Sequence, residues 1–253
     1  MFSKFPKTRP ALPPEFQTIY AEQYKQNRDG SSTASGLAQK MESWMHRKVA
    51  ADVVSGPEKS TLEIGAGTLN HLPYEDHSKP YDIVEPFHYL YESSHLKERL
   101  RNVYDDILEI PEHTLFDRII SIAAFEHICS LPEVIARCGL HLADDGQLRA
   151  GIPSEGTILW RLGYKYTTGL EFRRKYNLDY EVLMRHEHVN TAQEIEEILR
   201  YFFTKVEVRV FGLAKFLSFY QFYACREPIV NRCSDYLTLG TGEATGRAGR
   251  NSL

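Results

Sequence analysis

A glycine turn and the carboxylate that follows it could together bind a nucleoside. The turn is Gly65-Ala66-Gly67, and it comes directly after a short apolar run from Thr61 to Ile64. Both glycines lack a Cβ atom where a ligand would have to lie against the backbone. A second apolar run, Tyr81 to Val84, ends on Glu85, 18 residues after Gly67. A glycine turn after one strand and a carboxylate after the next are typical of α/β sheets that bind ribose hydroxyls.

The same turn argues against two common nucleotide sites. A nicotinamide-binding fold uses G-x-G-x-x-G, but the sixth position here is Asn70. A P-loop needs Gly-Lys-Ser or Gly-Lys-Thr after its glycines, and the chain has neither at this point.

Three histidines are candidates for a general base, because an imidazole titrates near neutral pH. His127 follows the most apolar run of the chain, residues 118–124, and could instead orient the loop after that run. His186 and His188 flank Glu187 and could equally lie in a solvated loop or bond their neighbours. A His-x-His pair also suggests a metal, but no third ligand is evident in the sequence, so we expect no metal site.

Alternating apolar runs and helical patterns predict the elements that position these residues. A helical stripe runs from Leu37 to Val49, and Thr191-Ala192-Gln193-Glu194 is a capping box that opens another helix. Strands are predicted at 61–64, 81–84, 103–104, 118–124 and 147–152, followed by a hairpin of 206–211 and 218–225. We therefore predict an α/β fold: a seven-stranded, Rossmann-like, doubly wound sheet that is mostly parallel, with an antiparallel C-terminal hairpin and a helical cap. A helical stretch containing Tyr89, Leu90, Leu96 and Leu100 is predicted to follow the second strand.

The pattern divides the chain into three parts. We expect an N-terminal arm or lid over residues 1–36, a single domain over 37–230 and a flexible tail over 231–253. Within the domain, residues 154–188 break the alternation and follow the fifth strand, where doubly wound sheets have their ligand crevice. This insert is the predicted substrate cap. The insert either binds an anionic acceptor or has a solvated face through its basic residues, Arg161, Lys165, Arg173, Arg174, Lys175 and Arg185. It either lines a sugar or ring or packs the cap with its tyrosines, Tyr164, Tyr166, Tyr176 and Tyr180.

Composition limits the partners. The net charge of −4 over 253 residues gives no excess of cations for a phosphate backbone, so we do not expect nucleic acid as a partner. No apolar run is long enough to span a bilayer, and the N-terminus lacks the apolar region of a secretory signal. The four cysteines form no C-x-x-C pair, which favours a reducing, cytoplasmic compartment.

Between residues 58 and 153 the motifs resemble, in order, those of the class I S-adenosylmethionine-dependent methyltransferases. In that family an acid precedes the glycine turn, as Glu63 does here, and a second acid, matched by Glu85, ends the second strand. The segment from Asp106 to Pro111 matches the family's aspartate, apolar residue and later proline after the third strand. The segment from Phe116 to His127 resembles its Phe-Asp and Leu-Glu-His signature, and Ala143 to Gly146 takes the place of its Lys-Pro-Gly-Gly turn.

The resemblance implies S-adenosyl-L-methionine (SAM) as the cofactor. Glu85 would bind its ribose hydroxyls, Asp106 its adenine amino group and Ile107 its adenine ring. Arg28, in an N-terminal lid, would pair with its carboxylate. Leu69 stands where the family often has a third glycine, which predicts less room beside the methionine moiety. The implied cofactor residues are Glu63, Gly65, Ala66, Gly67, Glu85, Pro86, Asp105, Asp106, Ile107, Ser121, Ile122, Ala123 and Arg28.

The resemblance further implies an enzyme that moves a methyl group to a small-molecule acceptor, mainly by positioning it. A general base (His127, His186 or His188) is needed only if the acceptor is a hydroxyl or an ammonium group. Two alternatives stay open: a methyltransferase acting on protein or RNA, and a binding domain that keeps the fold without catalysis. The sequence identifies neither the acceptor nor the oligomeric state.

Overall fold

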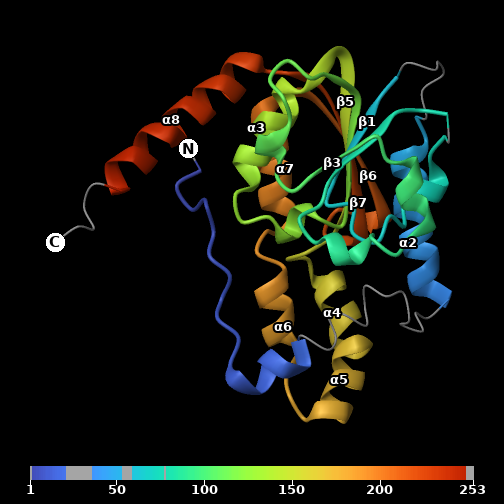
Figure 1. Ribbon diagram of the computed structural model, residues 1–253. Helices are drawn as coiled ribbons and strands as arrows, with labels where there is room; N and C mark the ends of the chain where they lie inside the picture. Colours follow the sequence, from blue (N-terminus) through green and yellow to red (C-terminus); the bar gives the residue numbers. More distant parts are fainter. Residues whose placement is uncertain (1, 21–35, 53–58, 77, 249–253) are drawn as a thin grey trace.

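The computed structural model describes residues 2–20, 36–52, 59–76 and 78–248. Its centre is one seven-stranded sheet with strand order β3-β2-β1-β4-β5-β7-β6 (Figure 1). Strands β1 to β5 pair in parallel, and β7 lies antiparallel between β5 and β6. The predicted fold is confirmed, including the C-terminal hairpin. The strands are β1 (Thr61–Ile64), β2 (Tyr81–Val84), β3 (Asn102–Tyr104), β4 (Phe116–Ile122), β5 (Leu142–Pro153), β6 (Phe203–Ala214) and β7 (Leu217–Pro228).

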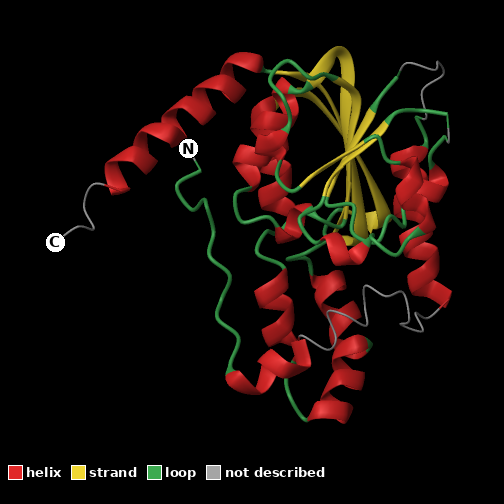
Figure 2. Cartoon of the chain, viewed as in Figure 1, coloured by secondary structure: helices red, strands yellow, loops and turns green. Residues whose placement is uncertain are grey.

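Helices cover both faces of the sheet, as the yellow strands between red helices show in Figure 2. On one face lies α2 (Gly36–Ala50), whose Val49 joins a core that includes side chains of β2, β4 and β7. On the other lie α3 (Leu131–Leu140) and α7 (Ala192–Phe202), with a larger core between them and the sheet (Figure 1). The capping box at Thr191 is present in the structure and fixes the start of α7.

Among the described residues, the connections between the first four strands contain only short 3-10 turns. They are η1 (Leu72–Tyr74), η2 (His88–Leu90), η3 (His95–Arg99) and η4 (Ile107–Glu109). The helical stretch predicted to contain Tyr89, Leu90, Leu96 and Leu100 is not one helix: the two separate turns η2 and η3 stand in its place. Ser94 explains the break, because its side chain accepts a hydrogen bond from the Leu96 amide and starts a new turn.

The insert after β5 folds into three helices, α4 (Ile158–Tyr166), α5 (Thr168–Tyr176) and α6 (Tyr180–Glu187), which extend below the sheet in Figure 1. The N-terminal segment completes this cap, since the ring of Phe16 stacks on Phe172 at 6.3 Å between centroids. Tyr176 and Tyr180 pack around Phe172, so these two tyrosines form the core of the cap.

The C-terminal segment is helical, contrary to the flexible tail predicted from residue 231. Helix α8 spans Val230–Ala248 and packs against α3 and α7 (Figure 1). Cys233 is buried, and Tyr236 and Leu237 lie against the larger core. Their spacing of three and four residues is that of one helical face, a short apolar pattern that the glycines further along obscure. In the described part of the chain, no helix has the length and apolarity needed to cross a membrane.

A buried ion network attaches α2 and η1 to the middle of the sheet. The guanidinium of Arg118, on β4, donates to both carboxylate oxygens of Glu75, at 2.7 and 3.1 Å, and to Asp52 at 3.1 Å. His71 contacts the same Glu75 carboxylate at 2.8 Å. Burial would raise the pKa of Glu75, but the hydrogen bonds from His71 and Arg118 outweigh it and lower the pKa to about 2.

We expect Glu75→Gln to lower the free energy of unfolding at pH 7 by about 3 kcal/mol, because the stabilisation linked to the low pKa is lost. The contribution is present above the unfolded-state pKa near 4.5 and is lost as the pH falls toward 2, so the difference from the wild type should shrink over that range. Urea unfolding from pH 7 to pH 2 measures this difference. Glu112→Gln, at an exposed position, is the control and should stay within about 0.5 kcal/mol of wild type. A difference that does not change with pH would contradict the assignment.

Candidate active site

The glycine turn lies at the carboxyl edge of the sheet, directly after β1. Gly65 and Gly67 both have left-handed backbones, with φ of 73° and 54°. A Cβ atom on Gly65 would lie 2.6 Å from the Cβ of Ala124, so this glycine allows the turn to pack against the segment after β4. A Cβ atom on Gly67 would meet nothing within 4 Å. Gly67 therefore borders open space, where a ligand could approach the backbone.

Glu85 connects this turn to the end of β2. One carboxylate oxygen accepts a hydrogen bond from the Gly67 amide at 2.7 Å, and the other accepts one from the Phe87 amide at 3.0 Å. The side chain is buried. Because each carboxylate oxygen can accept two hydrogen bonds, both oxygens keep capacity for a ligand hydroxyl.

Leu69 does not narrow the turn as the sequence predicts. Its φ of 63° is one that glycine adopts without strain, and its side chain is fully buried in the core on the α2 face. The side chain therefore points into the protein, away from the open space beside Gly67.

Glu63 lies inside the protein. It is 1% exposed and accepts a hydrogen bond from the Tyr81 hydroxyl at 2.7 Å. Burial raises its pKa to about 8, so the carboxyl group is protonated at neutral pH. The geometry gives Glu63 a packing role beneath the turn, and the sequence-based prediction of a cofactor contact gains no support from it.

The residues predicted after β2 and β3 form an exposed rim. Asp106 is exposed and caps η4, with one oxygen accepting from the Leu108 amide at 2.9 Å. Asp105 pairs with His88 at 2.5 Å, and this hydrogen bond raises the pKa of His88. The Ile107 side chain is buried, whereas Leu108 is 56% exposed. Phe87 (45% exposed) and Pro86 add an apolar surface beside it.

The end of β4 closes the edge on the other side of the turn. Ser121 is buried and its hydroxyl donates to the Ile64 carbonyl at 3.0 Å, which joins β4 to β1. Ile122 and Ala123 are partly exposed, and Ala123 has a left-handed φ of 49°. Ala66 is buried within the turn. Arg28 falls outside the described residues, so its predicted contact stays a prediction.

Two of the three predicted histidines meet just beyond β4. His127 ends η5 (Phe125–His127), His188 caps the end of α6, and their rings contact edge to face at 4.9 Å. Glu126, next to His127, joins them: ligand atoms of Glu126, His127 and His188 lie within 4.8 Å of one another. His186 does not join this cluster, because its Nδ1 contacts the Pro10 carbonyl at 2.8 Å. Glu126 is not among the site residues predicted from the sequence, where it forms part of the Phe116–His127 motif.

Carboxylates orient both rings of the cluster. Nδ1 of His127 lies 2.9 Å from the Glu187 carbonyl and 3.2 Å from its carboxylate. Burial would lower the pKa of His127, but the hydrogen bond with Glu187 and the charge of Glu126 outweigh it and raise the pKa. Nδ1 of His188 lies 2.7 Å from the Glu155 carboxylate, which also accepts from Trp160 Nε1 at 2.7 Å.

The N-terminal segment fixes this cluster in place, which no sequence pattern indicated. The guanidinium of Arg9 donates to the carbonyls of His186 (3.0 Å), Glu187 (3.1 Å) and His127 (2.8 Å).

From the α6–α7 connection, Asn190 Nδ2 donates to the carbonyls on either side of the cluster, those of Phe125 and Ile128, both at 2.8 Å. One side chain thus joins the end of the cap to the segment after β4.

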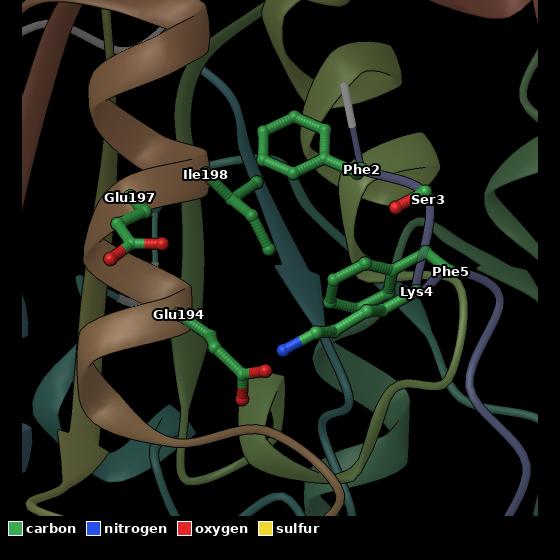
Figure 3. Close-up of a pocket in the computed structure, with 7 residues that line it drawn as sticks. All are labelled: Phe2, Ser3, Lys4, Phe5, Glu194, Glu197 and Ile198. Atoms are coloured by element: carbon green, nitrogen blue, oxygen red, sulfur yellow. The ribbon is translucent and has the colours of Figure 1, made fainter.

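One cavity in the described part of the chain lies away from these residues. It has a volume of about 200 Å³ and lies between the N-terminal segment and α7, lined by Phe2, Ser3, Lys4, Phe5, Glu194, Glu197 and Ile198 (Figure 3). None of the residues at the carboxyl edge lines it. We therefore attribute it to imperfect packing of the N-terminal segment on α7.

Comparison with known proteins identifies the fold. No family model matches the sequence, and no curated protein sequence is similar to it. Among solved structures, the CurJ carbon methyltransferase matches with a TM-score of 0.51 and 20% identity, over 84% of this chain and 58% of that one. A phosphoethanolamine-type N-methyltransferase 2 from Haemonchus contortus, in complex with phosphomonomethylethanolamine and S-adenosylhomocysteine, matches with a TM-score of 0.52 and 14% identity, over 75% of this chain and 53% of that one.

A third structure, a SAM-dependent methyltransferase from Thermotoga maritima described as a possible histamine N-methyltransferase, has a TM-score of 0.54 and 14% identity, over 83% of this chain and 97% of that one. This chain therefore spans little more than half of the first two proteins and nearly all of the third. At these identities the likeness shows the fold. The chain has the Rossmann-like fold of the class I SAM-dependent methyltransferases.

We expect Arg9→Ala to loosen the cluster, because three carbonyls lose a charged donor and each such bond contributes about 1.5–3 kcal/mol at most. Amide hydrogen exchange should become faster at 125–128 and 186–190, while the centre of the sheet keeps its protection. The control is Arg185→Ala, since Arg185 is 72% exposed and pairs only with Glu181 among its described ion pairs. Unchanged exchange at both segments in Arg9→Ala would show that the contacts with Arg9 do not hold them.

Proposed function

We propose that this protein is a SAM-dependent methyltransferase acting on a small-molecule acceptor. The observation that carries the proposal is the open space over Gly67, directly beside the buried Glu85 carboxylate, at the carboxyl edge of a methyltransferase fold. Doubly wound sheets bind nucleosides at this edge. Within the described chain, the space that a Cβ on Gly67 would occupy and the two oxygens of Glu85 fit a ribose that lies against the turn.

When bound, SAM would supply an electrophilic methyl group on a sulfonium centre. Glu85 would accept hydrogen bonds from the two ribose hydroxyls while it holds the Gly67 amide. Asp106 would accept from the adenine amino group through the oxygen that does not cap η4. The exposed side chains of Phe87 and Leu108 add apolar surface for the adenine ring at the same rim.

The acceptor would enter between this edge and the cap of α4 to α6. A net charge of −4 disfavours a nucleic-acid acceptor. The Haemonchus contortus and Thermotoga maritima proteins with this fold are both described as acting on small molecules, the second as a possible histamine N-methyltransferase. The basic residues of the cap give little support to an anionic acceptor. Arg161 and Arg185 both pair with Glu181, while Arg173, Arg174 and Lys175 lie in α5, at the end of the cap far from the sheet (Figure 1).

Proton removal from the acceptor would fall to the cluster after β4. Nδ1 of His127 and Nδ1 of His188 contact carboxylates, so each ring leaves its Nε2 for the acceptor or for a ligand that holds it. His186, whose ring contacts the N-terminal segment, has no part in this proposal. Positioning by the cap and by the β4 edge would supply most of the rate enhancement.

Calorimetry with SAM tests the proposal. Glu85→Gln should weaken binding by about 2 kcal/mol, because charge-assisted bonds to the hydroxyls are lost. Gly67→Ala should weaken it at least about tenfold by placing a methyl group in the ligand space, at a stability cost near 1 kcal/mol from its positive φ. Glu92→Gln, on the same loop as Glu85 but exposed, is the matched control. A folded wild-type protein that does not bind SAM would overturn the proposal and leave the non-catalytic alternative.

A further inference from the structure

Glu126, His127 and His188 present three metal-ligand groups to one point beyond the end of β4. A ligand atom from each residue lies within 4.8 Å of the other two. We propose that these three residues bind a divalent transition metal ion of the Zn²⁺ class. The position of this site stands on the geometry described below, and its use in catalysis rests on the proposed function.

Both imidazoles are held as metal-binding histidines usually are. Such a histidine donates the proton of its other nitrogen to a carboxylate or carbonyl group, which fixes the ring and leaves a lone pair for the metal. Here Nδ1 of His188 lies 2.7 Å from the Glu155 carboxylate. Nδ1 of His127 lies 2.9 Å from the Glu187 carbonyl and 3.2 Å from its carboxylate. In both rings Nε2 is therefore the ligand atom.

The third ligand, Glu126, is a buried carboxylate that the surrounding protein does not satisfy. It is 1% exposed, and among the described residues its Oε2 has no hydrogen-bond partner. Its Oε1 lies 3.8 Å from His127 Nε2, which is too long for a hydrogen bond. A buried acceptor without a partner is costly. A cation between the three side chains would remove that cost, whereas a hydrogen-bonded histidine pair would leave it in place.

The composition of the set selects the class of ion. Two imidazoles and one carboxylate suit Zn²⁺, Fe²⁺ and related ions, while Mg²⁺ and Ca²⁺ prefer oxygen ligands. Bonds of about 2.1 Å would require the three groups to approach by about 1 Å, which side-chain rotation allows. Three protein ligands leave at least one coordination position open. The open position would take an oxygen of the acceptor, and a hydroxyl bound there loses its proton to solvent more readily. The acceptor class is therefore an alcohol, phenol or enol.

Cobalt(II) is the probe, because it replaces Zn²⁺ at such sites and absorbs visible light when bound by imidazole. The full-length protein, first treated with a chelator, should bind one equivalent of Co²⁺ with a visible spectrum, and Zn²⁺ should displace it. Glu126→Gln and His188→Ala should weaken Co²⁺ binding at least about 100-fold. His186→Ala, two residues from His188 but outside the cluster, is the matched control and should bind as the wild type does.

Glu155→Gln tests the metal site even if the ligand variants fail to fold. This change leaves all three ligands in place and should weaken Co²⁺ binding by about 10- to 100-fold, because the His188 ring loses its orienting carboxylate. Absence of stoichiometric binding by folded wild-type protein, or equal affinity in wild type and Glu126→Gln, would overturn the site. Calorimetry of SAM with the metal-free protein is a separate measurement. SAM binding without Co²⁺ binding would reject the metal site alone, and the reverse result would reject the proposed function alone.

Discussion

The parallel pairing of β1 with both β2 and β4 is the constraint on which the candidate site depends. Glu63 on β1 is level with Ile83 on β2 and with Ile120 on β4, so the three strands end at one edge. The residues that follow them, Gly65, Glu85 and Ala123, therefore lie at the same edge of the sheet although they are far apart in the sequence. Two short contacts then make the edge rigid: the Gly67 amide on Glu85 and the Ser121 hydroxyl on the Ile64 carbonyl.

Two buried carboxylates at this edge, those of Glu85 and Glu126, differ in their hydrogen-bond partners. Glu85 accepts two backbone amide hydrogen bonds, so each of its carboxylate oxygens has a partner before any ligand arrives. Glu126 is equally buried, but one of its oxygens has no partner among the described residues. Because an unsatisfied buried acceptor is costly, its retention beside two oriented imidazoles is the physical reason to assign it a ligand. In our proposals the first carboxylate binds the nucleoside and the second a metal ion beside the acceptor.

Local patterns predicted the sheet and the turn well, because the information lies within a few residues. The bounds of β1 and β2 and the capping box at Thr191 follow from apolar runs and from one capping motif. The burial of Glu63 could not be predicted in this way. Alternation along β1 places it on the face opposite Leu62, and a strand covered by helices on both faces buries both sets of side chains. The inward direction of Leu69 likewise depends on a left-handed backbone that a non-glycine residue rarely adopts.

The contacts of Arg9 and Glu155 with the Glu126–His127–His188 cluster and its flanking backbone are long-range, which explains why no motif revealed them. Arg9 is more than 100 residues from each of the carbonyls that it binds, and His188 is 33 residues from Glu155. The N-terminal segment is thus a structural part of the site: Phe16 packs in the core of the cap, and Arg9 joins the end of the cap to the segment after β4. A displacement of this segment would move His127 and His188 together relative to the β1 turn. The N-terminal segment therefore adds to the strand pairing a second set of contacts, which hold the backbone at His127 and next to His188.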